Sequence, residues 1–230
     1  MSLENSARIT DAFARIAHKN IPVGSFVNIG SGRGDDLKFF KGIWPDMRTL
    51  LIDMDDRFLE GWNGLKKWYP GTEYVVCGAA SKDGIGHFAK SNDVGGAISN
   101  TADSESEMHE TPLRSVDSLV REFDLKPPYF LKFDTHGVEL DILEGAKETL
   151  AKTSLIMTEA YNFKLDFVDG ENLTFDEMCQ HMRTLGFRCM DMCEPLYRPG
   201  DLALWQVHLI FARDDHRAFL SNSYRFDMAR

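Results

Sequence analysis

The sequence has few cysteines, no excess of positive charge and no long apolar run, and each feature excludes a class of protein. The four cysteines form no CxxC pair, and their spacing is unlike that of a zinc site. Acidic residues outnumber basic ones by 36 to 26, and the resulting net charge of −10 repels a nucleic-acid backbone. No stretch approaches the roughly 18 consecutive apolar residues that a membrane-spanning helix needs.

The N-terminal residues also lack the charged, apolar and small-residue segments of a secretory signal. With cysteines that read as free thiols, this predicts a cytoplasmic protein whose partners include neither nucleic acid nor membrane. The 43% hydrophobic content is enough for a buried core, and 230 residues suit one large α/β domain. We expect an N-terminal helix within 1–22, the domain over 23–213 and a tail over 214–230.

Short apolar runs alternate with segments of helical periodicity along most of the chain. The predicted strands are Ser25–Ile29, Thr49–Ile52, Glu73–Ala79, Tyr129–Phe133, Leu155–Thr158, Phe187–Cys193 and Leu204–Ala212. Strands separated by helices favour right-handed crossovers and a parallel sheet covered on both faces. Because the last two strands are joined by a loop without helical periodicity, we expect them to pair antiparallel.

A glycine-rich turn follows the first predicted strand and precedes a helix. It reads Asn28-Ile29-Gly30-Ser31-Gly32-Arg33-Gly34. Glycines allow the backbone to approach a ligand closely and to adopt positive φ, and the helix that follows offers free N–H groups. A dinucleotide-binding turn needs GxGxxG, whereas GxGxG after a polar residue is typical of the first motif of S-adenosylmethionine-dependent methyltransferases.

Asp53 ends the second predicted strand, where a carboxylate can accept both hydroxyls of a ribose. The alternative roles for Asp53 are a helix N-cap and a surface charge. The preceding glycine turn favours ribose binding over both. Small residues, including Ala79 and Ala80, end the third strand. They suit a flat adenine ring, and tight packing explains them equally well. The predicted cofactor residues are Asn28, Gly30, Ser31, Gly32, Gly34, Asp53, Ala79 and Ala80.

The segment from Tyr129 to Ala146 closely resembles the sequence that characterises FkbM-family methyltransferases. Its matching residues are Lys132, Asp134, Gly137, Glu139, Leu143, Gly145 and Ala146. The segments Leu113 to Leu119 and Ala80 to Phe88 extend the resemblance, which covers about residues 26–212. Two residues depart from the family pattern: His136 replaces a usual Glu, and Asn28 replaces a common Asp.

This resemblance implies a Rossmann-like class I methyltransferase fold, with a mostly parallel seven-stranded sheet, a C-terminal antiparallel hairpin and helices on both faces. It also implies S-adenosylmethionine as the cofactor and O-methylation of a hydroxyl on a sugar or another small molecule. The sequence does not identify this acceptor or the oligomeric state. A non-catalytic domain that binds S-adenosylmethionine and a nucleotide-dependent oxidoreductase are the alternatives.

The candidate catalytic residues lie where strands end in an open α/β sheet: Asp134, His136 and Glu159. Asp134 is the first candidate for a base or a substrate-orienting group, with a helix N-cap as its alternative. His136 titrates near neutral pH, although a histidine in a loop is often only solvated. Asp134 and Glu159 together offer oxygen ligands for Mg²⁺, and we do not expect that metal. The polar stretch Ser91 to Glu110 is either a lid or a plain surface loop.

Overall fold

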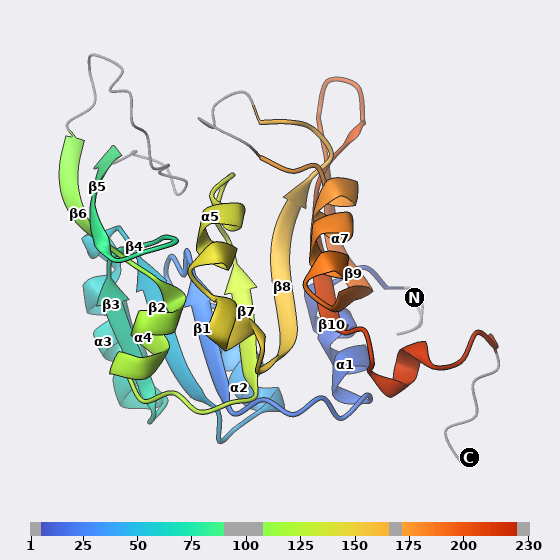
Figure 1. Cartoon of the computed structure of the whole chain (residues 1–230), viewed down its shortest axis with the longest axis horizontal. Helices are drawn as coiled ribbons and strands as arrows, with labels where there is room; N and C mark the ends of the chain where they lie inside the picture. The colour runs from blue at the N-terminus through green and yellow to red at the C-terminus, as the bar shows by residue number, and fades with distance from the viewer. Residues whose placement is uncertain (1–5, 90–107, 166–171, 225–230) are drawn as a thin grey trace.

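A computed structural model describes residues 6–89, 108–165 and 172–224. Its main sheet has seven strands in the order β3-β2-β1-β7-β8-β10-β9 (Figure 1). These strands are β1 (Ser25–Ile29), β2 (Arg48–Asp53), β3 (Thr72–Val76), β7 (Tyr129–Phe133), β8 (Thr153–Tyr161), β9 (Phe187–Tyr197) and β10 (Leu204–Arg213). The first five are parallel, and β10 pairs antiparallel with both β8 and β9. The predicted parallel sheet with a C-terminal antiparallel hairpin is therefore confirmed.

Helices cover both faces of this sheet (Figure 1). One face carries α1 (Ile9–Ala17), α2 (Leu37–Ile43) and α3 (Leu59–Trp68), the last preceded by the short helix η2 (Asp56–Phe58). The other carries α4 (Val116–Glu122), α5 (Glu139–Glu144), α6 (Lys147–Leu150) and α7 (Phe175–Thr184), and η3 (Arg217–Phe219) follows the sheet. Among the described residues, no helix has the length and apolar character needed to cross a membrane.

The apolar core on the α1 and α2 side is rich in phenylalanine. Phe130 of β7 is fully buried and stacks on Phe26 of β1, with 4.7 Å between ring centroids. Phe13 of α1 and Phe40 of α2 contact the same ring at 5.7 and 5.1 Å. Offset and edge-on aromatic contacts of this kind stabilise a core beyond the area they bury. They attach both helices to the middle of the sheet.

A second, three-stranded sheet lies beside the first, in the order β4-β6-β5. It consists of β4 (Gly78–Ala79), β5 (Gly84–Ala89) and β6 (Met108–Arg114). The third predicted strand is therefore divided: β3 ends at Val76, and the residues from Gly78 belong to this sheet. Strands β5 and β6 pair antiparallel, with His87 opposite Glu110. Most of the candidate lid lies in residues 90–107, outside the described residues.

Two further elements differ from their predictions. The sequence from Glu139 to Leu150 has helical periodicity and predicts a single helix, but the structure interrupts it between α5 and α6. At Gly145 a Cβ atom would lie 2.1 Å from the carbonyl oxygen of Ala80, so the chain is held against another segment there. Strand β8 continues to Tyr161, three residues beyond its predicted end, because β10 pairs with it up to that residue.

We predict that Phe130→Ala lowers the free energy of unfolding by about 3–5 kcal/mol, because it removes a buried ring that four other aromatic side chains contact. Urea denaturation measures the change. Trp68→Ala is the control, since Trp68 is 81% exposed, and it should change stability little. Equal losses in the two variants would contradict this account of the core.

Candidate active site

A cavity of about 540 Å³ opens at the carboxyl ends of the parallel strands. The glycine turn after β1 forms one wall, and the ends of β2 and β4 form a second. The third wall is the segment after β7, from Asp134 to His136. In an open α/β sheet this edge is where ligands bind, at the point where the strand order reverses beside β1.

The glycine turn has the backbone conformation that its composition predicts. Gly30, Gly32 and Gly34 all have positive φ, at 71°, 50° and 71°. A Cβ on Gly30 would lie 2.2 Å from the carbonyl oxygen of Asp134, so the turn rests directly on the segment after β7. A Cβ on Gly32 would meet nothing within 4 Å, which shows that this residue faces open space. The indole Nε1 of Trp62 donates to the Gly32 carbonyl oxygen at 2.8 Å and holds the turn from α3.

Asp53 is held at the end of β2 by two backbone donors. The N–H of Gly32 donates to Oδ2 at 2.8 Å, and that of Asp55 donates to Oδ1 at 3.0 Å. Burial raises the pKa of Asp53, and these hydrogen bonds oppose the rise. Each carboxylate oxygen keeps a lone pair in addition to the one used, so the group can still accept ribose hydroxyls from the cavity.

The structure places most of the predicted cofactor residues in two adjoining walls of the cavity. Gly30, Ser31, Gly32, Gly34, Asp53 and Ala79 line the cavity. Asn28 and Ala80 are not in its lining. Asn28 is fully buried in β1, and its side-chain oxygen and nitrogen have no hydrogen-bond partner among the described residues. The backbone of Ala80 instead bonds to the Arg114 carbonyl oxygen.

The residues present fit S-adenosylmethionine. The side-chain-free surface at Gly32 leaves room for the amino-acid end of the molecule, and Asp53 can accept the ribose hydroxyls. Cys77, Gly78 and Ala79 line the wall beside Asp53, and their small side chains leave room for a flat ring such as adenine.

A buried ion-pair cluster lies next to the cavity. The Nζ atom of Lys132 is 2.7 Å from Oδ2 of Asp36 and 2.7 Å from Oδ2 of Asp134. Burial alone would lower the pKa of Lys132, but the two carboxylates outweigh it and raise that pKa. For Asp134, burial raises the pKa and the Lys132 ammonium outweighs it, so the pKa falls below its usual value. Lys132 and Asp134 are therefore both charged at neutral pH.

Glu159 lies behind Asp134 and outside the cavity lining. Burial raises its pKa to about 7, helped by the negative charge of Asp134. The hydroxyl of Tyr161 donates to Oε1 of Glu159 and also lies 2.9 Å from Nδ1 of His136. The three predicted catalytic residues thus lie together, with His136 in the cavity wall and Glu159 connected to it through Tyr161.

The loop that carries His136 is held by a buried acid. Oε1 of Glu139 accepts hydrogen bonds from the Thr135 hydroxyl at 2.9 Å and from the Gly137 N–H at 3.1 Å. Gly137 has a φ of 82°, which favours glycine. The segment therefore turns tightly around Glu139 and presents His136 beside the cavity.

Two residues of this cluster, Tyr161 and His208, were not predicted from the sequence. Nε2 of His208 lies 3.7 Å from Oε2 of Glu159, because β10 pairs His208 with Glu159. The sequence does carry a signal for each: Tyr161 lies two residues after Glu159, on the same face of a strand, and His208 interrupts an apolar strand. Ligand atoms of Asp134, Glu159 and His208 lie within 4.8 Å of one another, as in a metal site. The Lys132 ammonium beside Asp134 opposes a second cation there.

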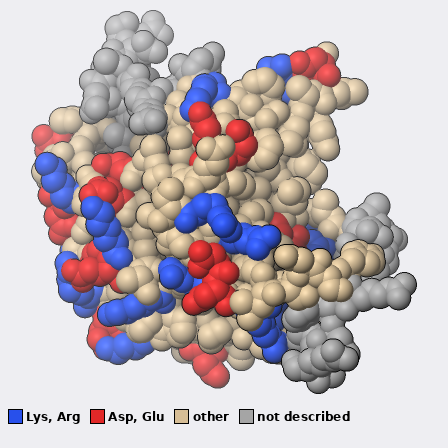
Figure 2. Space-filling view, turned by 45° about the vertical axis from the view of Figure 1, so that its right-hand side comes forward, with Lys and Arg blue, Asp and Glu red and all other residues tan. Residues whose placement is uncertain are grey.

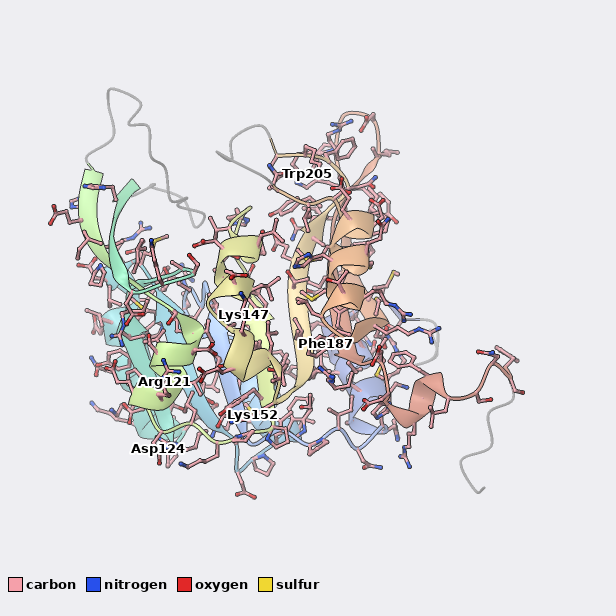
Figure 3. All side chains as sticks on the ribbon, in the orientation of Figure 1. Arg121, Asp124, Lys147, Lys152, Phe187 and Trp205 are labelled. Carbon is pink, nitrogen blue, oxygen red and sulfur yellow. The ribbon has the colours of Figure 1, made fainter. Side chains whose placement is uncertain are left out.

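A smaller cavity of about 240 Å³ lies away from the glycine turn, with Arg121, Asp124 and Lys152 in its wall. Figure 3 shows these three side chains at the opposite end of the sheet from Trp205. Of these two cavities, the larger one combines the glycine turn with titratable side chains from two strand ends.

The strand order, the glycine turn and the acid at the end of β2 together define a class I methyltransferase that uses S-adenosylmethionine. Residues 18–189 match the family described as the methyltransferase FkbM domain, and the chain belongs to this family. S-adenosylmethionine is therefore the methyl donor, as predicted. The family also favours a methyltransferase over the non-catalytic and oxidoreductase alternatives. No curated protein sequence matches the chain significantly.

Solved structures resemble the chain at low sequence identity. An rRNA methylase from Streptococcus thermophilus is 11% identical, with a TM-score of 0.46, over 87% of this chain and 94% of that one. A precorrin-6y C5,15-methyltransferase from Geobacter metallireducens GS-15 is 10% identical, with a TM-score of 0.44, over 91% of each chain. A SAM-dependent methyltransferase from Aquifex aeolicus is 12% identical, with a TM-score of 0.41, over 91% of this chain and 94% of that one. At this similarity, the acceptors named for those proteins say nothing about the acceptor here.

We predict that S-adenosylhomocysteine raises the melting temperature of the protein and that Asp53→Ala removes most of this rise. A ligand at a hundred times its Kd stabilises the folded state by about 2.7 kcal/mol. Differential scanning fluorimetry measures the shift. Glu60→Ala, at an exposed position on α3, should keep it. A full shift in the Asp53 variant would remove Asp53 from the cofactor site.

Proposed function

We propose that the protein transfers the methyl group to a hydroxyl oxygen of a small acceptor, such as a sugar. The observation that carries this proposal is the position of His136 in the wall of the cofactor cavity, next to Asp134. A hydroxyl group holds its proton tightly at neutral pH, so its methylation benefits from a base at the reacting oxygen. Burial lowers the pKa of His136, so its imidazole is neutral at pH 7 and can accept a proton.

Each catalytic candidate then has a separate task. S-adenosylmethionine supplies an electrophilic methyl group on its sulfonium. His136 takes the proton from the acceptor hydroxyl, and the negatively charged Asp134 orients that hydroxyl through a hydrogen bond. Glu159, buried behind both residues, acts on His136 through Tyr161. No step of this scheme needs a metal ion.

Aromatic side chains support an acceptor with a flat, partly apolar face. Beyond Tyr161, the ring of Trp205 lies 6.0 Å away in an edge-on contact, and Phe163 stacks on Trp205 at 5.5 Å. Figure 3 shows Trp205 at the carboxyl end of β8, the same end of the sheet as the cavity. These three rings lie outside the lining of the cavity, where an acceptor that extends beyond His136 would meet them.

The surface charge gives no support to a nucleic-acid acceptor. On the face shown in Figure 2, Lys and Arg side chains are interspersed with Asp and Glu instead of forming a basic patch. Arg121, for example, pairs with Glu148, and Lys147 pairs with Glu144. A net charge of −10 adds to the repulsion of phosphate groups.

The proposal is tested by incubating the protein with methyl-labelled S-adenosylmethionine and a panel of sugars, glycosides, phenols, amines and RNA. We expect label on hydroxyl oxygens of a small acceptor, and mass spectrometry with base treatment distinguishes ethers from methyl esters and methylamines. Label confined to amines or to RNA would contradict O-methylation of a small molecule.

With the acceptor found in this way, we predict that Asp134→Asn lowers kcat by roughly 10²-fold, because the amide has lost the charge that orients the hydroxyl. The thermal shift with S-adenosylhomocysteine should survive. Asp124→Asn makes the same change at the opposite end of the sheet (Figure 3) and should leave kcat unchanged. Undiminished turnover in the Asp134 variant would exclude this residue from the mechanism.

A further inference from the structure

The hydroxyl of Tyr161 joins two groups that the proposed function uses. It contacts Nδ1 of His136 at 2.9 Å and Oε1 of Glu159. Tyr161 is 7% exposed, and the Glu159 side chain is 9% exposed, so bulk water does not compete strongly for either contact. The His136 side chain is 25% exposed and lines the cavity. The three residues form a hydrogen-bonded chain from the interior to the cavity wall.

The direction of these hydrogen bonds follows from the number of protons. A tyrosine hydroxyl donates one hydrogen bond and accepts others through its oxygen. An ionised Glu159 can only accept, so the Tyr161 proton points to Oε1. A protonated Glu159 shares its proton with Asp134, to which it is hydrogen-bonded, because an ionised carboxylate accepts more strongly than a phenol. In both states, Tyr161 donates to Glu159.

The Tyr161 oxygen then has only lone pairs to offer His136. The hydrogen bond at 2.9 Å therefore requires a proton on Nδ1 of His136. A neutral imidazole carries one proton, so its Nε2 is left with a free lone pair. An unconstrained histidine in water exists as both tautomers, and here one of them is selected.

We propose that Tyr161 is a positioning residue, which fixes His136 as the Nδ1–H tautomer and thereby presents a basic Nε2 to the acceptor hydroxyl. This inference rests on the proposed O-methylation for its purpose. As the acceptor oxygen bonds to the methyl carbon and the carbon–sulfur bond breaks, the hydroxyl proton passes to Nε2. The positive charge that forms on the imidazole faces Oε1 of Glu159, 3.7 Å from Nδ1.

The other charged groups around His136 either stabilise its imidazolium, as Glu159 does, or are balanced by opposite charges. Asp134, two residues before it, is negative and stabilises the imidazolium. Lys132 is positive, and its charge is balanced by Asp36 and Asp134. His208 of β10 faces Glu159 from the other side and is neutral at pH 7, because burial lowers its pKa.

The tautomer can be measured without any acceptor. In long-range ¹H–¹⁵N spectra of protein labelled at histidine nitrogens, His136 is assigned by the signals that His136→Gln removes. Above the pKa of His136, we expect a protonated Nδ1 and an unprotonated Nε2 in the wild type. Tyr161→Phe should give a mixture of tautomers or the Nε2–H form. An Nε2–H tautomer in the wild type, or unchanged signals in Tyr161→Phe, would overturn the proposal.

Tyr129→Phe is the matched control. Tyr129 is also a buried strand tyrosine, and its hydroxyl donates to the Leu125 carbonyl oxygen at the other end of the sheet. This variant should leave the His136 signals unchanged. The thermal shift with S-adenosylhomocysteine, retained in Tyr161→Phe, shows that the cofactor site is still folded.

Two kinetic measurements separate positioning from a merely structural role. Tyr161→Phe should lower kcat by roughly 10²-fold with little change in KM for S-adenosylmethionine. Activity requires neutral His136 and falls as pH drops through its pKa. Loss of the Tyr161 contact removes a group that stabilises the imidazolium, so this pKa and the acid limb should move to lower pH. A shift to higher pH would overturn the proposal.

These results distinguish this inference from the proposed function. The predicted tautomer together with methylation confined to amines would refute O-methylation and leave the assignment of the His136 proton intact. Methylation of a hydroxyl by a protein with the Nε2–H tautomer would support O-methylation and refute the assignment of the His136 proton.

Discussion

The contact between the Lys132 ammonium and two carboxylates is the interaction on which the site depends. A buried ammonium is costly unless charged partners surround it, and Asp36 and Asp134 each contact Lys132 at 2.7 Å. This arrangement connects the end of β7 to the start of α2 and keeps Asp134 ionised. Lys132 contacts Asp134 directly, whereas burial and the negative charge of Asp134 together raise the pKa of Glu159 to about 7. One lysine thus explains why two neighbouring acids behave differently.

Close backbone packing joins the glycine turn to the segment that carries the proposed catalytic residues. The turn at Gly30 lies against the Asp134 carbonyl oxygen, where even one Cβ atom would not fit. Any displacement of the glycine turn would therefore move the segment that carries Asp134 and His136. Methyl transfer requires the donor and the acceptor oxygen to be aligned within a fraction of an ångström, and this packing is a direct way to keep them aligned.

Strand and helix positions were predictable because each depends on local pattern. The buried strand Tyr129–Phe133 was predicted to the residue, since the two prolines before it and Asp134 after it set its limits. The break between α5 and α6 was not predicted, because helical periodicity continues through Gly145. It arises from contact with Ala80, 65 residues earlier in the chain, and no local pattern reports such a contact.

The sequence by itself determined the family, the methyl donor and the positions of Asp53 and Asp134 at strand ends, because glycine turns and strand-terminal carboxylates recur at set spacings. Only the tertiary structure decided how Glu159 reaches the cavity. The register of β8 against β10 places His208 opposite Glu159, and the extension of β8 places Tyr161 between Glu159 and His136. Pairing between distant strands sets both positions, and the local residue pattern contains no information about that register.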